Sequence, residues 1–108
     1  MKEYRLNITK EAKKKAKESL ELRNRLPKYK RFGLDKKEAK RLKINSGVER
    51  AKQLINSKSI SYKDAVAVAK FSRWLKRPRT QRVQGSIDLW GGEDFIKKAR
   101  EFVRRNKK

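Results

Sequence analysis

The 108-residue sequence contains no cysteine and no histidine. Without cysteine the chain can form neither a disulfide nor a zinc finger. Without histidine it lacks the commonest general base of enzymes and the usual nitrogen ligand of transition metals. We therefore expect neither an enzyme nor a cofactor-dependent protein, and no small-molecule substrate.

Acidic residues and long apolar runs are also scarce. Only 12 acids accompany 34 lysines and arginines, which gives a formal net charge of +22. Repulsion between so many like charges opposes folding, so a polyanionic partner would stabilise the fold as well as bind it. We expect DNA or RNA rather than a membrane, because the chain has no run of about 18 apolar residues and no apolar signal-peptide segment. A charged surface that has no partner is the alternative.

The hydrophobic residues, 35% of the chain, recur at helical rather than strand spacing. This periodicity predicts an all-α fold, a small orthogonal bundle of four to five helices. We expect an N-terminal arm at residues 1–9, a single helical domain at residues 10–104 and a basic tail at residues 105–108. The segment from Tyr4 to Ile8 is the only strand-like alternation.

Capping residues predict where the first three helices begin and end. The first runs from about Lys10 to Leu26, where Pro27 ends it. The second ends near Lys43 and the third near Asn56. A residue that can cap the helix precedes each of them, and in the second and third a glutamate completes a capping box. These capping residues are Thr9, Asp35 and Ser46.

A fourth helix begins at Ser61 and extends to about Lys76, because Pro78 allows little more. It is apolar on most sides, a pattern typical of a helix at the buried centre of a small domain. A basic loop follows it, and Ser86 begins a single helical turn that the paired glycines end. We interpret Trp90, which precedes those glycines, as a core residue.

The last helix begins with Glu93 and Asp94, where acids suit the helix dipole. Together with Asp88 these two residues form the only acidic cluster, and such a cluster can hold Mg²⁺. We favour the simpler interpretation, in which Glu93 and Asp94 only stabilise the start of the helix.

Two basic segments are the candidate nucleic-acid-binding sites. Arginine binds phosphate through two parallel hydrogen bonds, and a loop that contains Pro78 presents its cations at low entropic cost. The 73–82 strip, around the end of the fourth helix, consists of Arg73, Lys76, Arg77, Arg79 and Arg82. The 28–41 strip, around the second helix, consists of Lys28, Lys30, Arg31, Lys36, Lys37, Lys40 and Arg41.

Tyr29 and Phe32 lie between the cations of the 28–41 strip. Proteins that bind single strands stack bases on aromatic rings placed in this way. The alternative, which we favour, is that Phe32 packs into the core and Tyr29 covers it, because a small domain needs its aromatic residues inside.

Base-specific recognition has weaker support. A helix-turn-helix across the third and fourth helices would have a long connection, from Asn56 to Ile60, and an unusually apolar recognition helix. Four amides can hydrogen-bond adenine edges but are better explained as surface or turn residues. These are Gln53, Asn56, Gln81 and Gln84.

Three groups of residues occur in a distinctive order: Glu18–Arg23, then Gly47–Leu54 with Ile60–Ser61 and Phe71–Arg73, then Leu89–Gly92. In this order they resemble a small helical domain of unassigned activity that recurs in tailed-phage and prophage proteins. Trp74 stands where that domain has a histidine, and residues 93–95 replace a stretch of small residues. The resemblance spans most of the chain and implies a phage or prophage origin.

We therefore predict a phage- or prophage-type basic protein that binds DNA or RNA through backbone phosphates with little sequence specificity. Its expected location is the cytoplasm of the host cell or the virion. Two alternatives stay open. One is a virion structural or assembly protein whose basic face contacts packaged DNA or an acidic capsid or tail partner. The other is a modulator of a host nucleic-acid machine.

Overall fold

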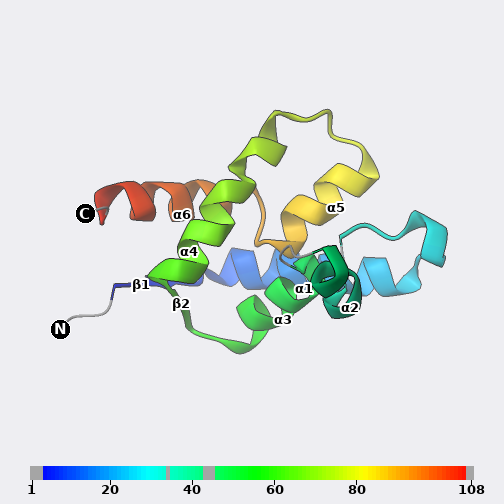
Figure 1. Cartoon of the computed structure of the whole chain (residues 1–108), viewed down its shortest axis with the longest axis horizontal. Coiled ribbons are helices and arrows are strands. Elements are labelled where there is room, and N and C mark those ends of the chain that lie inside the picture. Colours follow the sequence, from blue (N-terminus) through cyan, green and yellow to red (C-terminus); the bar gives the residue numbers. More distant parts are fainter. Residues whose placement is uncertain (1–3, 34, 43–45, 107–108) are drawn as a thin grey trace.

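Helices make up most of the computed structural model in Figure 1, which describes residues 4–33, 35–42 and 46–106. This confirms the prediction of a mostly helical chain. The described part contains six α-helices, where four to five were expected. Their bounds are α1 Lys10–Arg25, α2 Lys36–Leu42, α3 Gly47–Asn56, α4 Tyr62–Lys70, α5 Gln81–Leu89 and α6 Glu93–Arg105. Lys43, residues 1–3 of the expected arm and residues 107–108 of the expected tail lie outside the described residues.

The first four predicted helix starts are confirmed by their capping hydrogen bonds. The Thr9 hydroxyl accepts a bond from the Ala12 amide at 3.0 Å. Asp35 and Glu38 form both bonds of a capping box, because each side chain accepts from the other residue's amide, at 2.8 and 3.4 Å. The Ser46 and Ser61 hydroxyls cap α3 and α4 in the same way, because each accepts a hydrogen bond from the amide of the third helical residue.

A two-stranded antiparallel ribbon joins the start of the chain to its middle. Strand β1 (Arg5–Asn7) pairs with β2 (Ser59–Ser61), and Leu6 lies opposite Ile60. Ile8 is buried, and its amide donates to the Lys58 carbonyl at 2.9 Å. Residues 5–8, which we expected in a separate arm, are therefore built into the domain.

The fourth helix differs from its prediction in length and in burial. The α-helix ends at Lys70, and a 3-10 helix, η2 (Phe71–Lys76), continues from it. Only Ala65 and Val68 of α4 are buried, so α4 is not surrounded by other elements as its composition suggested. It packs along α6 on one side, and its other side borders a groove.

Helix α5 begins at Gln81, near the end of the expected basic loop, and it replaces the single turn that was expected from Ser86. The Thr80 hydroxyl caps it by accepting from the Val83 amide at 3.2 Å. Gly85, a weak helix former, lies in its middle, where the absence of a Cβ leaves room for the ring of Phe32. Ser19 of α1 donates to the Gly85 carbonyl at 2.7 Å, in the buried interface. Packing between the two helices therefore outweighs the local propensity.

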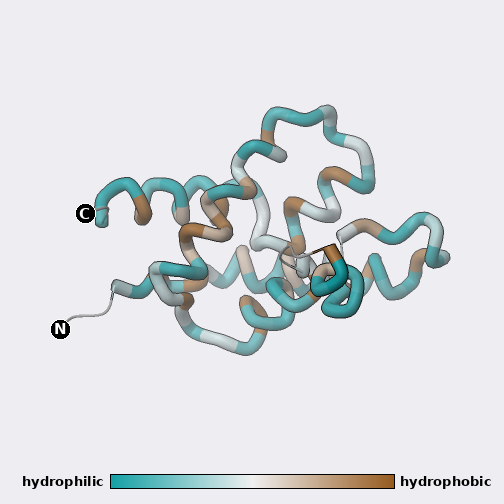
Figure 2. Tube along the Cα trace, viewed as in Figure 1, coloured by the Kyte–Doolittle hydropathy of each residue, from teal (hydrophilic) through white to brown (hydrophobic). Residues whose placement is uncertain are grey.

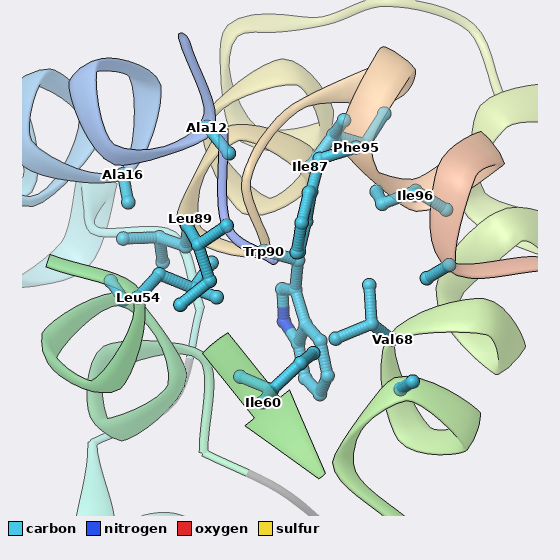
Figure 3. Close-up of a cluster of buried hydrophobic side chains, with 14 of the residues drawn as sticks. Ala12, Ala16, Leu54, Ile60, Val68, Ile87, Leu89, Trp90, Phe95 and Ile96 are labelled. Carbon is cyan, nitrogen blue, oxygen red and sulfur yellow. The ribbon is translucent and has the colours of Figure 1, made fainter. Parts of the chain in front are cut away.

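The core contains side chains from five of the six helices and from β2, gathered around Trp90 (Figure 3). Trp90 is only 5% exposed, which confirms its interpretation as a core residue. Gly91 and Gly92 follow it with φ of +101° and +89°, values that favour glycine and that turn the chain from α5 into α6. Figure 2 shows hydrophilic residues along the two connections that carry the basic strips.

Candidate nucleic-acid interface

All twelve cations of the two strips are exposed. Within the described residues Arg79 alone among them forms an ion pair, with its Nη2 3.1 Å from Oε1 of Glu93. The other eleven charges have no acidic partner there, so they present an attractive potential to a polyanion.

The structure brings the two strips together. A 3-10 turn, η1 (Lys28–Lys30), carries the first cations of the 28–41 strip. Arg82, at the start of α5, donates from Nη2 to the carbonyl oxygen of Tyr29 in that turn at 3.1 Å. In Figure 1 this turn projects at the right and the 77–80 loop at the top, with the start of α5 between them.

A groove of about 690 Å³ lies where the strips meet. Arg31 of the 28–41 strip and Arg73 and Arg82 of the 73–82 strip line it, and Lys70 at the end of α4 adds a fourth cation. Glu38 is the one acid in this lining. The groove therefore has a strong positive bias. The other nine predicted cations lie on neighbouring segments and do not line it.

Aromatic rings form much of the groove wall. Phe71 stacks on Trp74, with ring centroids 5.0 Å apart, and on Trp90, with centroids 4.7 Å apart. The ring planes are 11° apart in both pairs. The Arg77 guanidinium lies 4.0 Å from the Trp74 centroid, and the Arg50 guanidinium lies 5.1 Å from that of Trp90. Guanidinium groups therefore lie against the two outer rings of the series.

Phe32 is a core residue, as the favoured interpretation had it, and is therefore not available as the possible stacking residue. It is 1% exposed, and its ring packs against Gly85, where an added Cβ would lie 2.6 Å from three ring carbons. Tyr29 is 76% exposed and does not cover Phe32 as the alternative supposed. Lys30 Nζ lies 5.8 Å from the Tyr29 ring centroid, and the rest of the ring surface is open to a ligand.

A buried arginine that sequence reasoning missed holds the 28–41 strip in place. Arg23 of α1 is 7% exposed and donates from Nε to the Phe32 carbonyl at 2.7 Å. Its Nη2 lies 3.9 Å from Oε1 of Glu38 on α2. One guanidinium thus connects α1, the loop and α2. Among the surrounding charges nothing in the sequence distinguishes Arg23 from a surface arginine.

Lys70, Phe71 and Trp74 were also absent from the predicted site. Lys70 belongs to a stretch from Ala65 to Ile87 that contains no acid, and this was the available signal. Phe71 and Trp74 are three residues apart, which is also the spacing of core residues on a helix. Both rings are half-buried, so each contributes to the core and to the groove wall.

Three acids line a second depression, of about 440 Å³, between α1 and α5. Glu18, Glu21 and Asp88 line it, and burial raises the pKa of Asp88. The described residues contain no group of three or more acids placed to hold a metal ion.

The described structure offers little for base-specific recognition. The connection between α3 and α4 contains strand β2 rather than a tight turn. Three of the four candidate amides donate hydrogen bonds within the protein: Gln53 to Asp64, Asn56 to the Lys52 carbonyl and Gln84 to Asp88.

None of the helices in the described part of the chain has the length and apolar character of a membrane-spanning segment. The resemblance to a phage domain stays a prediction. Comparison with known proteins found no matching protein family, no matching curated protein and no matching solved structure.

Proposed function

We propose that this protein binds nucleic acid through the groove and the two basic strips around it. Backbone phosphates are the main contacts, and there is little sequence specificity. The observation that carries the proposal is the hydrogen bond between Arg82 and Tyr29, which joins two cation-rich segments 53 residues apart at one concave surface. The absence of acidic partners for eleven of the twelve predicted cations, among the described residues, supports it.

Phosphate contacts fit this surface better than base-edge contacts. Arginine and lysine bind phosphate oxygens whatever the sequence, and each contact releases counterions from the polymer. About six such contacts on duplex DNA predict that log K falls with log salt concentration with a slope of roughly −5.

The test is a titration of the full chain with duplex DNA, single-stranded DNA and RNA of equal length, between about 50 and 200 mM salt. We expect binding to persist near physiological salt and to weaken steeply as salt rises. A slope shallower than about −2, or the loss of binding to all three polymers at moderate salt, contradicts the proposal.

A matched pair of variants locates the binding surface. The test variant combines Lys70→Gln with Arg73→Gln, which neutralises two groove cations. The control combines Lys98→Gln with Arg100→Gln, two exposed residues of α6 outside the groove lining. Each double variant loses one lysine charge and one arginine charge. Any effect of net charge alone on affinity is therefore the same in the two variants. We expect the groove variant to bind more weakly and to reduce the salt slope by about 2.

The setting predicted from the sequence, a phage or prophage protein in the host cytoplasm or the virion, is compatible with this activity because viral genomes are polyanions. An acidic capsid or tail protein would meet the same cations. Abundance of the chain in purified particles whose nucleic acid has been removed would favour that assembly role.

A further inference from the structure

The groove combines an aromatic wall with a cationic rim, and we infer that it takes one unpaired nucleotide. The preferred polymer is then a single strand, or a strand with a base displaced from its duplex. This inference rests on the proposed function and names its substrate class.

The lining of the groove matches the two halves of a nucleotide. Trp74 provides an aromatic face for a base, since Phe71 is enclosed between the two tryptophans and Trp90 is buried. Arg31 and Arg82 provide guanidinium groups for its phosphate. The volume of about 690 Å³ is of the size that proteins use for small organic ligands. Phosphate contacts alone require no apolar hollow, because cations on a convex surface are sufficient.

A base inside a duplex cannot fill this hollow. Its two faces are covered by the neighbouring base pairs, and only its edges are accessible in the grooves. An unpaired base presents a whole face, so it can enter the groove and stack.

Trp74 is the ring best placed to receive the base. Trp90 is 5% exposed and held in the core, and Phe71 stacks on both tryptophans, so the plane of Trp74 is set before a ligand arrives. The exposed Arg77 guanidinium lies against Trp74 at 4.0 Å, and because Arg77 does not line the groove, this face of Trp74 is at the edge of the groove. A cation–π contact at an exposed site is weaker than base stacking, so a base displaces Arg77, which then pairs with the adjacent phosphate.

The test measures tryptophan fluorescence and affinity together. Single strands and duplexes of about 12 nucleotides are titrated into the full-length chain and into its Trp74→Phe and Trp74→Ala variants. In the parent we expect the single strand to quench emission more than the duplex. Trp74→Phe keeps an aromatic ring and retains most of the single-strand affinity. It loses most of the quenching, because the remaining tryptophan, Trp90, is buried.

Trp74→Ala should lower single-strand affinity by about 5- to 150-fold, the range reported by alanine substitution at base-stacking aromatics, and change duplex affinity by less. Thermal unfolding of each variant shows whether it is folded. If Trp74→Ala does not fold, the quenching difference between the parent and Trp74→Phe decides the question alone.

The outcomes separate the inference from the proposed function. If binding depends on salt but shows no preference for single strands, and if quenching survives in Trp74→Phe, the unpaired-nucleotide site is overturned. Phosphate binding then remains intact. Failure of every polymer to bind overturns both.

Discussion

Arg82 donates a hydrogen bond from Nη2 to the carbonyl oxygen of Tyr29, 3.1 Å away and 53 residues earlier in the chain. The bond links the start of α5 to the η1 turn, and so joins the two basic strips. Because Arg82 also lines the groove, the residue that positions the strips is itself one of the proposed phosphate ligands.

Replacement of Arg82 by lysine tests whether its geometry matters beyond its charge. Arg82→Lys keeps the positive charge but loses the planar guanidinium that reaches Tyr29. We expect affinity for nucleic acid to fall by about 3- to 10-fold, the equivalent of roughly one hydrogen bond. Arg100→Lys on α6 is the control and should bind like the parent. Equal affinity of Arg82→Lys and the parent protein would show that the link is unimportant.

Tyr29 should act as an independent stacking residue. Its ring is 76% exposed, so Tyr29→Ala should leave the melting temperature nearly unchanged. We expect the variant to lose about 5- to 150-fold in single-strand affinity, with a smaller change for the duplex. Tyr29→Phe keeps the ring and should bind like the parent. A Tyr29→Ala variant that binds single strands normally would remove Tyr29 from the interface.

Gly85→Ala should destabilise the fold, although alanine is the better helix former by about 1 kcal/mol. The added Cβ would lie 2.6 Å from three ring carbons of Phe32, which is buried and has little room to move. Overpacking of this kind costs about 1–3 kcal/mol, so we expect a net loss of up to about 2 kcal/mol in chemical denaturation.

Shortening the Phe32 side chain provides the control for this clash. In a Phe32→Leu background the ring carbons that meet the new Cβ are absent, so Gly85→Ala should cost less there than in the parent. A double-mutant cycle measures this coupling. Additive effects, or a stabilised Gly85→Ala single variant, would contradict the described packing of α5 against Phe32.

Asp64→Asn should destabilise the protein in a pH-dependent way. Burial acts to raise the pKa of Asp64, but hydrogen bonds from Gln53 and Arg50 outweigh it and lower the pKa below its ordinary value of 3.8. The Arg50–Asp64 pair is 3.1 Å long, and the Arg50 side chain is 10% exposed, so neutralising Asp64 leaves a largely buried cation without its partner. We expect a loss of about 1–3 kcal/mol at neutral pH.

The sign of the pH effect follows from the lowered pKa. A carboxyl whose pKa is lower in the folded state adds stability above its ordinary value, and this stability is lost as pH falls through the folded pKa. The difference between the parent and Asp64→Asn should therefore be full at neutral pH and shrink below pH 3.8. Unfolding curves of both proteins at several pH values measure it. A difference that stays constant into strong acid would show that Asp64 acts through packing and not through its charge.

The sequence was a good guide wherever the interactions are local. A capping residue bonds to an amide three positions away, so Thr9, Asp35, Ser46 and Ser61 could be assigned without knowledge of the fold. It was a poor guide to α5, because Gly85 disfavours a helix locally and its compensation comes from Ser19, 66 residues earlier. Similarly, the alternation of cations and rings from Lys28 to Phe32 does not reveal which ring is buried.

By itself the sequence determined that this chain is mostly helical, where most helices begin, and that its surface is strongly basic, because these depend on periodicity, local hydrogen bonds and composition. Only the tertiary structure decided that Phe32 is buried under α5 while Tyr29 is exposed. Only it placed Arg31, Arg73 and Arg82 around one groove with a stacked aromatic wall. The physical reason is that these contacts join residues far apart in the chain, and packing of the whole core sets their positions.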